Sequence, residues 1–206
     1  MTDLAEFGFH EIFIEGDQSA PVLLLLHGTG GDERDLLDLG KSVAPNASIL
    51  SIRGKITENG MPRFFRRLAE GVFDQEDLAF RTNELAGFIA AAKKHYHLED
   101  RPLYALGFSN GANIAASLLL RNPEALDGAI LLRAMIPFEP EALPDLSSKR
   151  ILLIAGLMDQ IIPAEQSKRL AEIFEQSKAE IKFILKPAGH QLIQSDLQDI
   201  QKFLAE

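Results

Sequence analysis

Six short apolar runs alternate with longer amphipathic stretches along the 206 residues of the chain. The apolar runs cover residues 22–26, 49–52, 103–108, 129–132, 151–155 and 181–185. The intervening stretches have apolar residues at helical spacing and cover 34–43, 81–97, 110–121, 164–177 and 195–204. Short apolar runs are typical of buried strands, and their alternation with helices requires crossovers between parallel strands. The pattern therefore predicts an α/β fold with a mostly parallel, twisted sheet and helices on both faces.

Three further segments refine this expectation. Residues 9–14 alternate in hydropathy, which predicts an antiparallel edge strand. Residues 53–80 contain several Gly and Asn, and residues 136–148 are rich in Pro and Glu. Ligands of open α/β sheets bind at the carboxyl ends of the strands, so we expect 53–80 to form part of the pocket wall or a lid. The sequence has no linker, and we expect 1–206 to form one domain without a large cap domain.

Composition excludes several classes of protein. The formal net charge is −9, which disfavours a nucleic-acid partner because such binding depends on clustered Lys and Arg. The chain has no Cys, so it can form neither a disulfide framework nor a Cys nucleophile. Residues 1–9 contain Asp3 and Glu6 and do not resemble a signal peptide, and no apolar run is long enough to span a membrane. We therefore expect a cytoplasmic protein.

The segment Gly107-Phe108-Ser109-Asn110-Gly111 joins a predicted strand to a predicted helix. A Ser in so sharp a turn needs Gly two positions away on either side, because a Cβ there would crowd the backbone. The turn exposes the hydroxyl at a helix N-terminus, where N–H groups favour negative charge. Ser109 is therefore a candidate nucleophile, although a Ser that only caps the helix gives the same pattern.

A serine nucleophile needs a base and an acceptor that orients the base, in the chain order Ser, Asp or Glu, His. Asp159 follows the predicted strand 151–155, and His190 follows the next strand, 181–185. Both loops leave the same edge of the sheet as Ser109. Other acidic residues could take the place of Asp159, although none lies so close behind a strand: Asp127, Asp145 and Glu165.

The segment His27-Gly28-Thr29-Gly30-Gly31 follows the first buried run directly. Glycines let the backbone approach a substrate carbonyl, so the N–H groups of Thr29 and Asn110 could form an oxyanion hole. A flexible turn and a phosphate-binding turn are alternatives. The segment lacks the Lys-Ser/Thr ending of a P-loop and the spacing of a dinucleotide-binding turn, which disfavours the phosphate site.

In order and spacing these motifs resemble α/β-hydrolases, and more narrowly the small bacterial phospholipase/carboxylesterase family, which includes acyl-protein thioesterases. The segments Ser51-Ile52-Arg53-Gly54 and 58–67 carry the narrower likeness. The resemblance implies Ser109 as nucleophile, His190 as general base and then acid, and Asp159 as its partner. It also implies Thr29 and Asn110 as oxyanion donors and requires no cofactor or metal.

The substrate pocket is less defined by the sequence. Residues 53–69 hold five basic residues and one acidic residue. Ion pairs within the protein would explain them, and the alternative is that Arg63 or Arg133 faces the cleft and favours substrates with an acid group. Apolar side chains could line an acyl or aryl pocket: Met61, Phe64, Phe65 and Phe73. Of these we expect Met61 or Phe64 to contact substrate.

The function that follows is hydrolysis of small or flexible carboxylic esters through an acyl-enzyme, by a monomer or homodimer. The same triad would cleave thioesters or lysophospholipids, so these remain alternatives. A ligand-binding protein that keeps the fold without turnover is a second class of function. A metallohydrolase is disfavoured because the sequence has no HExxH or equivalent ligand cluster.

Overall fold

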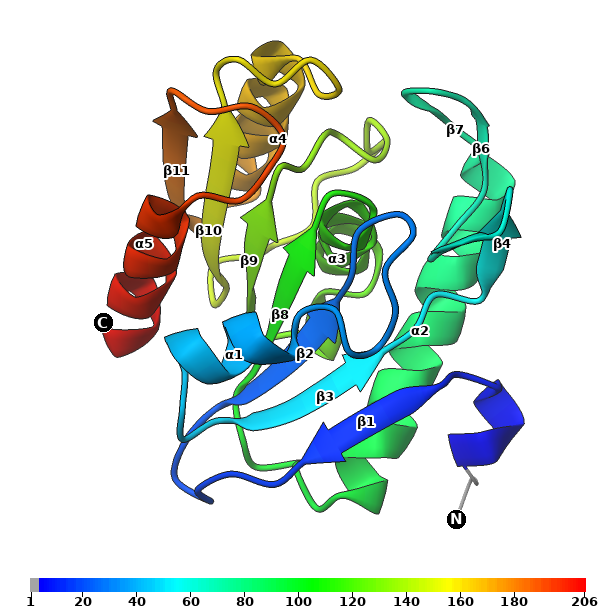
Figure 1. Ribbon diagram of the computed structural model, residues 1–206, viewed down its shortest axis with the longest axis vertical. Helices are drawn as coiled ribbons and strands as arrows, with labels where there is room; N and C mark the ends of the chain where they lie inside the picture. Colours follow the sequence, from blue (N-terminus) through cyan, green and yellow to red (C-terminus); the bar gives the residue numbers. More distant parts are fainter. Residues whose placement is uncertain (1–3) are drawn as a thin grey trace.

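The computed structural model describes residues 4–206 and is organised around one seven-stranded sheet in the order β1-β3-β2-β8-β9-β10-β11 (Figure 1). In that order the strands are Glu11–Ile14, Ser48–Ile52, Val22–Leu26, Leu103–Phe108, Gly128–Leu132, Arg150–Gly156 and Glu180–Lys186. Every neighbouring pair is parallel except β1 and β3, which are antiparallel. The predicted α/β fold and its antiparallel edge strand are therefore confirmed.

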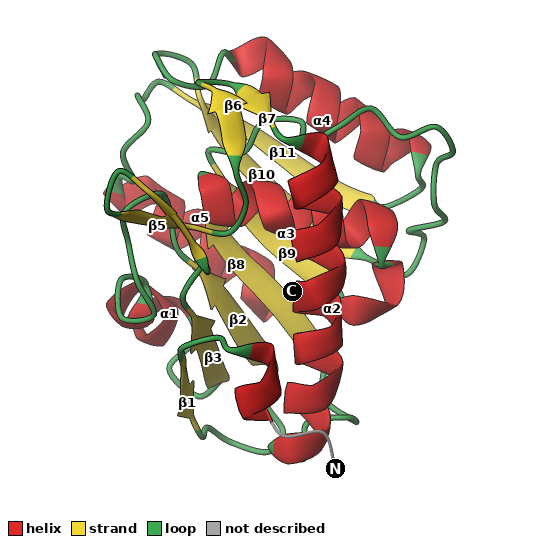
Figure 2. Cartoon of the chain, turned by 90° about the vertical axis from the view of Figure 1, so that its right-hand side faces the viewer, coloured by secondary structure: helices red, strands yellow, loops and turns green. Residues whose placement is uncertain are grey.

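Helices cover both faces of this sheet. Helices α1 (Leu37–Val43) and α5 (Gln194–Ala205) contact each other on one face. Helices α2 (Gln75–His95), α3 (Asn110–Arg121) and α4 (Ala164–Gln176) pack on the other, where Figure 2 shows α2 in front of the sheet. The described residues also contain two short 3₁₀ helices, at Leu4–Phe7 and Pro123–Ala125.

The central strands are buried on both faces, which explains their continuous apolar runs. In β2, Leu24 and Leu26 belong to the core under α2, α3 and α4, whereas Leu23 and Leu25 belong to the core under α1 and α5. All four side chains are fully buried. Successive strand residues point to opposite faces, so a strand between two helical layers must be apolar at every position.

The predicted element boundaries agree closely with the structure, with one clear exception. The helix expected at 81–97 begins at Gln75, six residues earlier. Asp74 caps it by accepting a hydrogen bond from the Asp77 N–H at 3.1 Å. The early start converts the end of the predicted 53–80 excursion into helix. We do not expect residues 1–9 to be a signal peptide. Of these, residues 1–3 lie outside the described residues.

The rest of that excursion folds into two small hairpins. Strand β4 (Ile56–Glu58) pairs with β5 (Met61–Arg63), and β6 (Arg67–Ala69) pairs with β7 (Val72–Phe73). Each hairpin is its own two-stranded sheet, separate from the main sheet. The left-handed Asn59 and Gly60, with φ of 51° and 79°, form the turn of the first.

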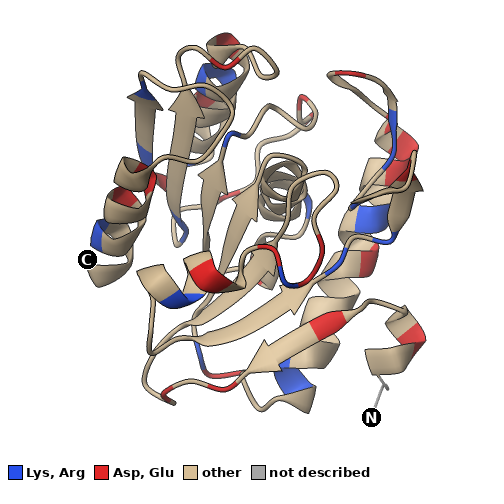
Figure 3. Ribbon diagram, viewed as in Figure 1, with Lys and Arg blue, Asp and Glu red and all other residues tan. Residues whose placement is uncertain are grey.

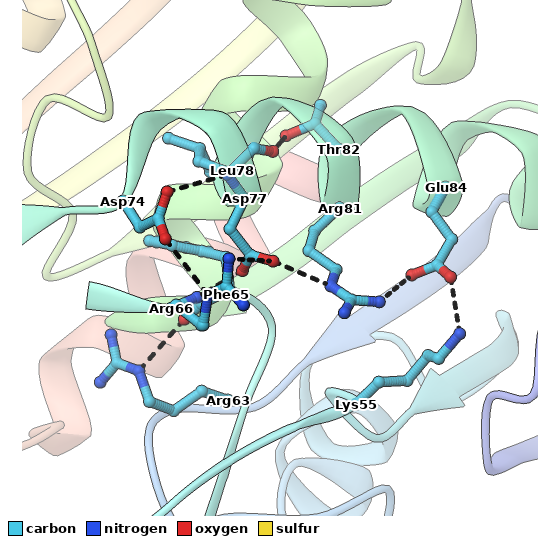
Figure 4. A network of polar contacts seen from close by, with 10 residues as sticks. All are labelled: Lys55, Arg63, Phe65, Arg66, Asp74, Asp77, Leu78, Arg81, Thr82 and Glu84. Carbon is cyan, nitrogen blue, oxygen red and sulfur yellow. Dashed lines mark hydrogen bonds and ion pairs between the residues drawn. The ribbon is translucent and has the colours of Figure 1, made fainter. Parts of the chain in front are cut away.

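Ion pairs and hydrogen bonds attach the hairpins to α2 (Figure 4). The buried Asp77 carboxylate accepts a hydrogen bond from the Arg66 N–H at 2.7 Å and lies 3.4 Å from Arg81 Nε. Lys55 Nζ is 2.6 Å from Glu84 Oε1. Figure 3 shows basic positions of this segment beside acidic positions of α2. Arg53, Arg66 and Arg67 likewise pair with Glu33, Asp74 and Glu58, so ion pairing explains most of the basic residues of 53–69.

Candidate active site

Ser109 occupies the sharp turn between β8 and α3, with φ 51° and ψ −112°. A positive φ is strained for a residue with a Cβ, and such strain is common at functional positions. The flanking glycines make the turn possible, because a Cβ on Gly111 would lie 2.0 Å from the Leu26 carbonyl oxygen. The Ser109 side chain forms no capping hydrogen bond with α3. Helix capping therefore does not explain this serine.

Ser109, His190 and Asp159 form one hydrogen-bonded chain. His190 Nε2 lies 3.0 Å from Ser109 Oγ, and His190 Nδ1 lies 2.8 Å from Asp159 Oδ2. Asp159 follows β10 and His190 follows β11, so three loops from the carboxyl edge of the sheet meet at this point. In this arrangement the hydroxyl can pass its proton to the imidazole, while the carboxylate accepts from the other ring nitrogen.

The Asp159 carboxylate is held in its ionised form. Burial of the group acts to raise its pKa, but hydrogen bonds from the Ile162 N–H, His190 and the Ile161 N–H outweigh it and hold the pKa below the usual value. The two backbone bonds reach Oδ1, at 3.0 Å from Ile162 and 2.8 Å from Ile161. An ionised acceptor keeps the His190 proton on Nδ1 and leaves Nε2 free to act as a base.

The alternative acidic residues have other partners. Asp127 accepts a hydrogen bond from the Leu103 N–H, at the opposite end of β8. Asp145 pairs with Lys178, and Glu165 pairs with Lys168. The structure therefore brings Asp159, and none of these three, to His190.

The N–H groups of Thr29 and Asn110 belong to residues that line the same cavity as Ser109. Within residues 4–206, neither N–H donates to another group of the protein. Asn110 is the first residue of α3, where a backbone N–H has no partner inside the helix. Both groups are thus available to a negatively charged oxygen.

Residues 54–64 hold the segments that carry these two N–H groups. The Gly54 N–H donates to His27 Nε2 at 2.9 Å, and the Gly30 N–H donates to the Pro62 carbonyl at 2.9 Å. The Phe64 N–H donates to Asn110 Oδ1 at 2.8 Å. The sequence did not predict this bracing, because it depends on backbone groups of an irregular segment.

His27 is buried between these segments. Burial lowers its pKa, and its Nδ1 lies 2.6 Å from the Gly28 carbonyl oxygen. A neutral ring that donates from Nδ1 and accepts at Nε2 satisfies both of its contacts.

The cavity beside Ser109 has a volume of about 320 Å³. Apolar side chains from several elements form much of its wall: Phe73, Phe108, Met135, Ile161 and Ile162. The polar and other lining residues are Thr29, Arg63, Arg67, Glu70, Gly71, Ser109, Asn110, Asn113 and His190. Of the apolar candidates from the sequence, Phe73 alone lines this cavity.

Met61 and Phe64 do not line this cavity, so the contact of one of them with substrate stays a prediction without support from the cavity. Met61 packs beside Gly30 and is 39% exposed. The Phe64 ring is buried against His27, with the ring centroids 4.8 Å apart. Met135 and Ile161, which line the cavity, follow β9 and β10. Their positions just after strands are the only sequence signal that could have predicted them as lining residues.

Of the two arginines that the sequence offered for the cleft, Arg63 lines the cavity and Arg133 does not. Its side chain is completely buried and points to the loop that carries His190. Arg133 Nε donates to the Gly189 carbonyl at 3.1 Å, and Nη2 donates to the Gln191 carbonyl at 3.0 Å. Arg133 therefore holds the two residues on either side of His190. A φ of 55° at Arg133 turns the chain toward this position.

From residue 4 to 206, no group of three or more His, Asp or Glu side chains is placed to hold a metal ion. No helix in that range is long and apolar enough to cross a membrane.

The sheet order, the two helical layers and the strand-turn-helix at Ser109 define a protein of the α/β-hydrolase fold. The chain belongs to the phospholipase/carboxylesterase family, whose model matches residues 8–206. It is therefore a hydrolase.

Individual relatives agree with this membership. MhqD of Bacillus subtilis (strain 168) is 44% identical over 192 residues, which cover 93% of this chain and 96% of MhqD. A carboxylesterase from Bacillus cereus has a TM-score of 0.94 at 44% identity, with 99% of both chains covered. A carboxylesterase from Mesorhizobium loti has a TM-score of 0.90 at 32% identity, covering 100% of this chain and 97% of its own.

Proposed function

We propose that the chain is a carboxylesterase that cleaves small or flexible esters through an acyl-enzyme on Ser109. The observation that carries the proposal is the hydrogen-bonded chain from Ser109 through His190 to Asp159, at a cavity whose lining includes Thr29 and Asn110. The carboxylesterases among its relatives support the same reaction.

The first half of the reaction forms the acyl-enzyme. Ser109 Oγ attacks the ester carbonyl carbon while His190 Nε2 takes the hydroxyl proton. The carbonyl oxygen becomes an oxyanion, which accepts hydrogen bonds from the N–H groups of Thr29 and Asn110. When the tetrahedral intermediate collapses, His190 gives its proton to the departing alcohol, and the acyl group stays on Ser109.

The second half repeats these steps with water. His190 takes a proton from water, whose oxygen attacks the acyl carbon and forms a second oxyanion in the same place. Collapse returns the proton to Ser109 Oγ and releases the carboxylic acid. Asp159 stabilises the imidazolium that forms in each half, because its carboxylate accepts from His190 Nδ1.

The proposal is tested with a fluorophosphonate probe and short-chain 4-nitrophenyl esters. We expect the wild type to label once at Ser109, and we expect Ser109→Ala and His190→Ala to lose labelling and at least about 10³-fold in kcat. Ser148→Ala, an exposed serine on the loop before β10, is the matched control and should keep wild-type activity. A wild type that neither labels nor turns over would instead favour a ligand-binding protein.

Thioesters and lysophospholipids are alternative substrates for the same proposed residues, because only the leaving group differs. Comparing kcat/KM for matched oxygen esters and thioesters would rank them. The cytoplasmic location, the single domain over 1–206 and the monomeric or dimeric state stay predictions, which imaging of the tagged protein, limited proteolysis and light scattering would check.

A further inference from the structure

Two arginines, Arg63 and Arg67, are among the residues that line the cavity beside Ser109. Arg63 ends β5 and Arg67 begins β6, so both come from the hairpin segment. Much of the remaining wall is apolar. A positive charge in such surroundings is costly in free energy unless a partner compensates it.

The Arg63 side chain is held in one orientation. Nε donates to the Phe65 carbonyl at 3.3 Å, and Nη1 donates to Thr29 Oγ1 at 2.6 Å. Nη2 donates no hydrogen bond to any residue from 4 to 206. Arg63 is only 4% exposed, so this remaining donor belongs to a guanidinium that is fixed before any ligand arrives.

The protein compensates the two charges only in part. The carboxylate nearest to Arg63 is Glu58, whose Oε2 is 3.6 Å from Nε. Glu58 already accepts both of its close contacts, at 3.0 Å each, from Arg67 Nε. One carboxylate therefore serves two guanidinium groups.

The electrostatics of Arg63 agree with this shortage. Burial lowers its pKa and the nearby charge of Arg67 lowers it further, and the opposing effect of Glu58 is smaller than either. An arginine stays protonated near neutral pH, so both positive charges persist and repel each other. An anion placed in the cavity would relieve that repulsion.

One acidic residue, Glu70, is also among the residues that line the cavity. Glu70 lies at the exposed turn between β6 and β7 and forms no ion pair within the described chain. Water screens an exposed charge far more than a buried one. Glu70 therefore does not supply the anion that Arg63 lacks.

We propose that Arg63, with Arg67 beside it, binds a carboxylate of the substrate, so that the preferred esters carry a carboxylate a few bonds from the scissile carbonyl. This inference rests on the proposed esterase function. The contact between Arg63 Nη1 and Thr29 Oγ1 places the guanidinium next to the residue whose N–H would hold the oxyanion. A charge-assisted hydrogen bond from Nη2 then orients the ester toward Ser109.

The test compares charged and neutral esters of the same size. On the acyl side the pair is 4-nitrophenyl hydrogen glutarate and 4-nitrophenyl methyl glutarate, followed by nitrophenol release after subtraction of the rate without enzyme. On the alcohol side it is 4-acetoxybenzoate and its methyl ester. We expect the wild type to favour the charged member of at least one pair by about tenfold or more in kcat/KM, because a charge-assisted hydrogen bond is worth that much.

The variants separate binding of the carboxylate from support of the fold. Arg63→Gln should reduce the charged-to-neutral ratio to near one, and Arg67→Gln should reduce it in part. Arg66→Gln is the matched control, because Arg66 is in the same segment but pairs with Asp74 and Asp77 and does not line the cavity. Its ratio should equal that of the wild type.

Several results would overturn the inference. A wild-type ratio near one in both pairs would do so, as would equal losses on charged and neutral esters in Arg63→Gln, because Arg63 would then only brace Thr29. If Arg63→Gln is inactive on every ester, the charged-to-neutral ratio is measured in Arg67→Gln instead, because Arg67 forms no hydrogen bond with Thr29. A ratio in Arg67→Gln equal to that of the wild type then overturns the inference.

Failure of the esterase proposal gives a different result. In that case the wild type hydrolyses neither the neutral nor the charged esters. Calorimetry with glutarate then tests the site alone: binding that Arg63→Gln abolishes and Arg66→Gln keeps supports the carboxylate site, and the absence of binding to the wild type overturns it.

Discussion

Arg133 Nη2 lies 2.7 Å from Asp196 Oδ2, and neither side chain has any exposed surface. The pair connects the end of β9 to the first turn of α5, 63 residues later. The same Asp196 oxygen accepts the Ile193 N–H at 2.9 Å. Because Arg133 also donates to the carbonyls of Gly189 and Gln191, this ion pair links the His190 loop to the first turn of α5.

Breaking the Arg133–Asp196 pair should be strongly destabilising. Arg133→Met leaves a buried carboxylate without its partner, and we expect it to lower the free energy of unfolding by about 3–5 kcal/mol. The double variant Arg133→Met/Asp196→Leu should be much more stable than the single one, since no buried charge remains. Urea denaturation measures both. A single variant as stable as the wild type would contradict this account of the pair.

The Asp159 carboxylate should matter for catalysis more than for folding. Asp159→Asn keeps the shape of the side chain but replaces the ionised acceptor of His190, so we expect kcat to fall by about 10³–10⁴-fold. The thermal midpoint should change little. Asp127→Asn, at the opposite end of β8, is the matched control, and its kcat per folded molecule should stay at the wild-type level. Wild-type kcat in Asp159→Asn would exclude the proposed role.

Stability should depend on pH through His27. Its folded-state pKa is lowered by burial from the ordinary value of 6.5, so the unfolded chain binds a proton there more readily than the folded one. The contribution of neutral His27 to the stability of the folded state is fully present above pH 6.5, and it is lost as the pH falls below that value toward the folded-state pKa. Urea midpoints measured between about pH 5 and 8 should therefore decrease toward the acidic end.

A comparison of variants shows whether His27 causes this dependence of the urea midpoint on pH. His27→Gln should flatten the dependence because its side chain does not titrate, while His95→Gln, an exposed residue of α2, should leave it unchanged. An equally steep slope in His27→Gln would attribute the dependence to other groups.

The turn at Ser109 should not tolerate a side chain at Gly111. The new Cβ of Gly111→Ala would lie 2.0 Å from the Leu26 carbonyl oxygen, so α3 or β2 must move. We expect a loss of at least about 2 kcal/mol in stability and a larger loss in kcat, because Asn110 moves with the helix. Gly60→Asn is the control: its position has open space and a positive φ that Asn accepts. Near-wild-type stability of Gly111→Ala would refute this.

The grouping of Ser109, Asp159 and His190 was predictable because a parallel sheet brings the carboxyl ends of its strands to one edge. Each of these residues follows a recognisable apolar run, so the strand pattern alone places all three there. No such rule reveals where a side chain turns once it has left a strand. Arg133 also follows a strand, and its inward turn depends on Asp196, whose proximity the sequence does not reveal.

The pocket wall was predictable in location but not in detail. The Asn59-Gly60 turn explains the hairpin of β4 and β5, yet the hairpin's orientation depends on hydrogen bonds to Gly30 and Asn110. These bonds involve backbone groups and bring Arg63 to the cavity while Phe64 packs on His27. The adjacent residues Arg63 and Phe64 thus have different roles, and the hydropathy pattern alone could not predict which of them lines the cavity.

The two hairpins pair only with themselves, and this has an evolutionary consequence. Insertions or replacements at the turn between β6 and β7, where Glu70 and Gly71 line the cavity, would alter its shape and charge without changing any hydrogen bond of the seven-stranded sheet. Descendants of this chain could acquire new substrate preferences by varying a few hairpin residues, while the machinery on the sheet stays under separate selection.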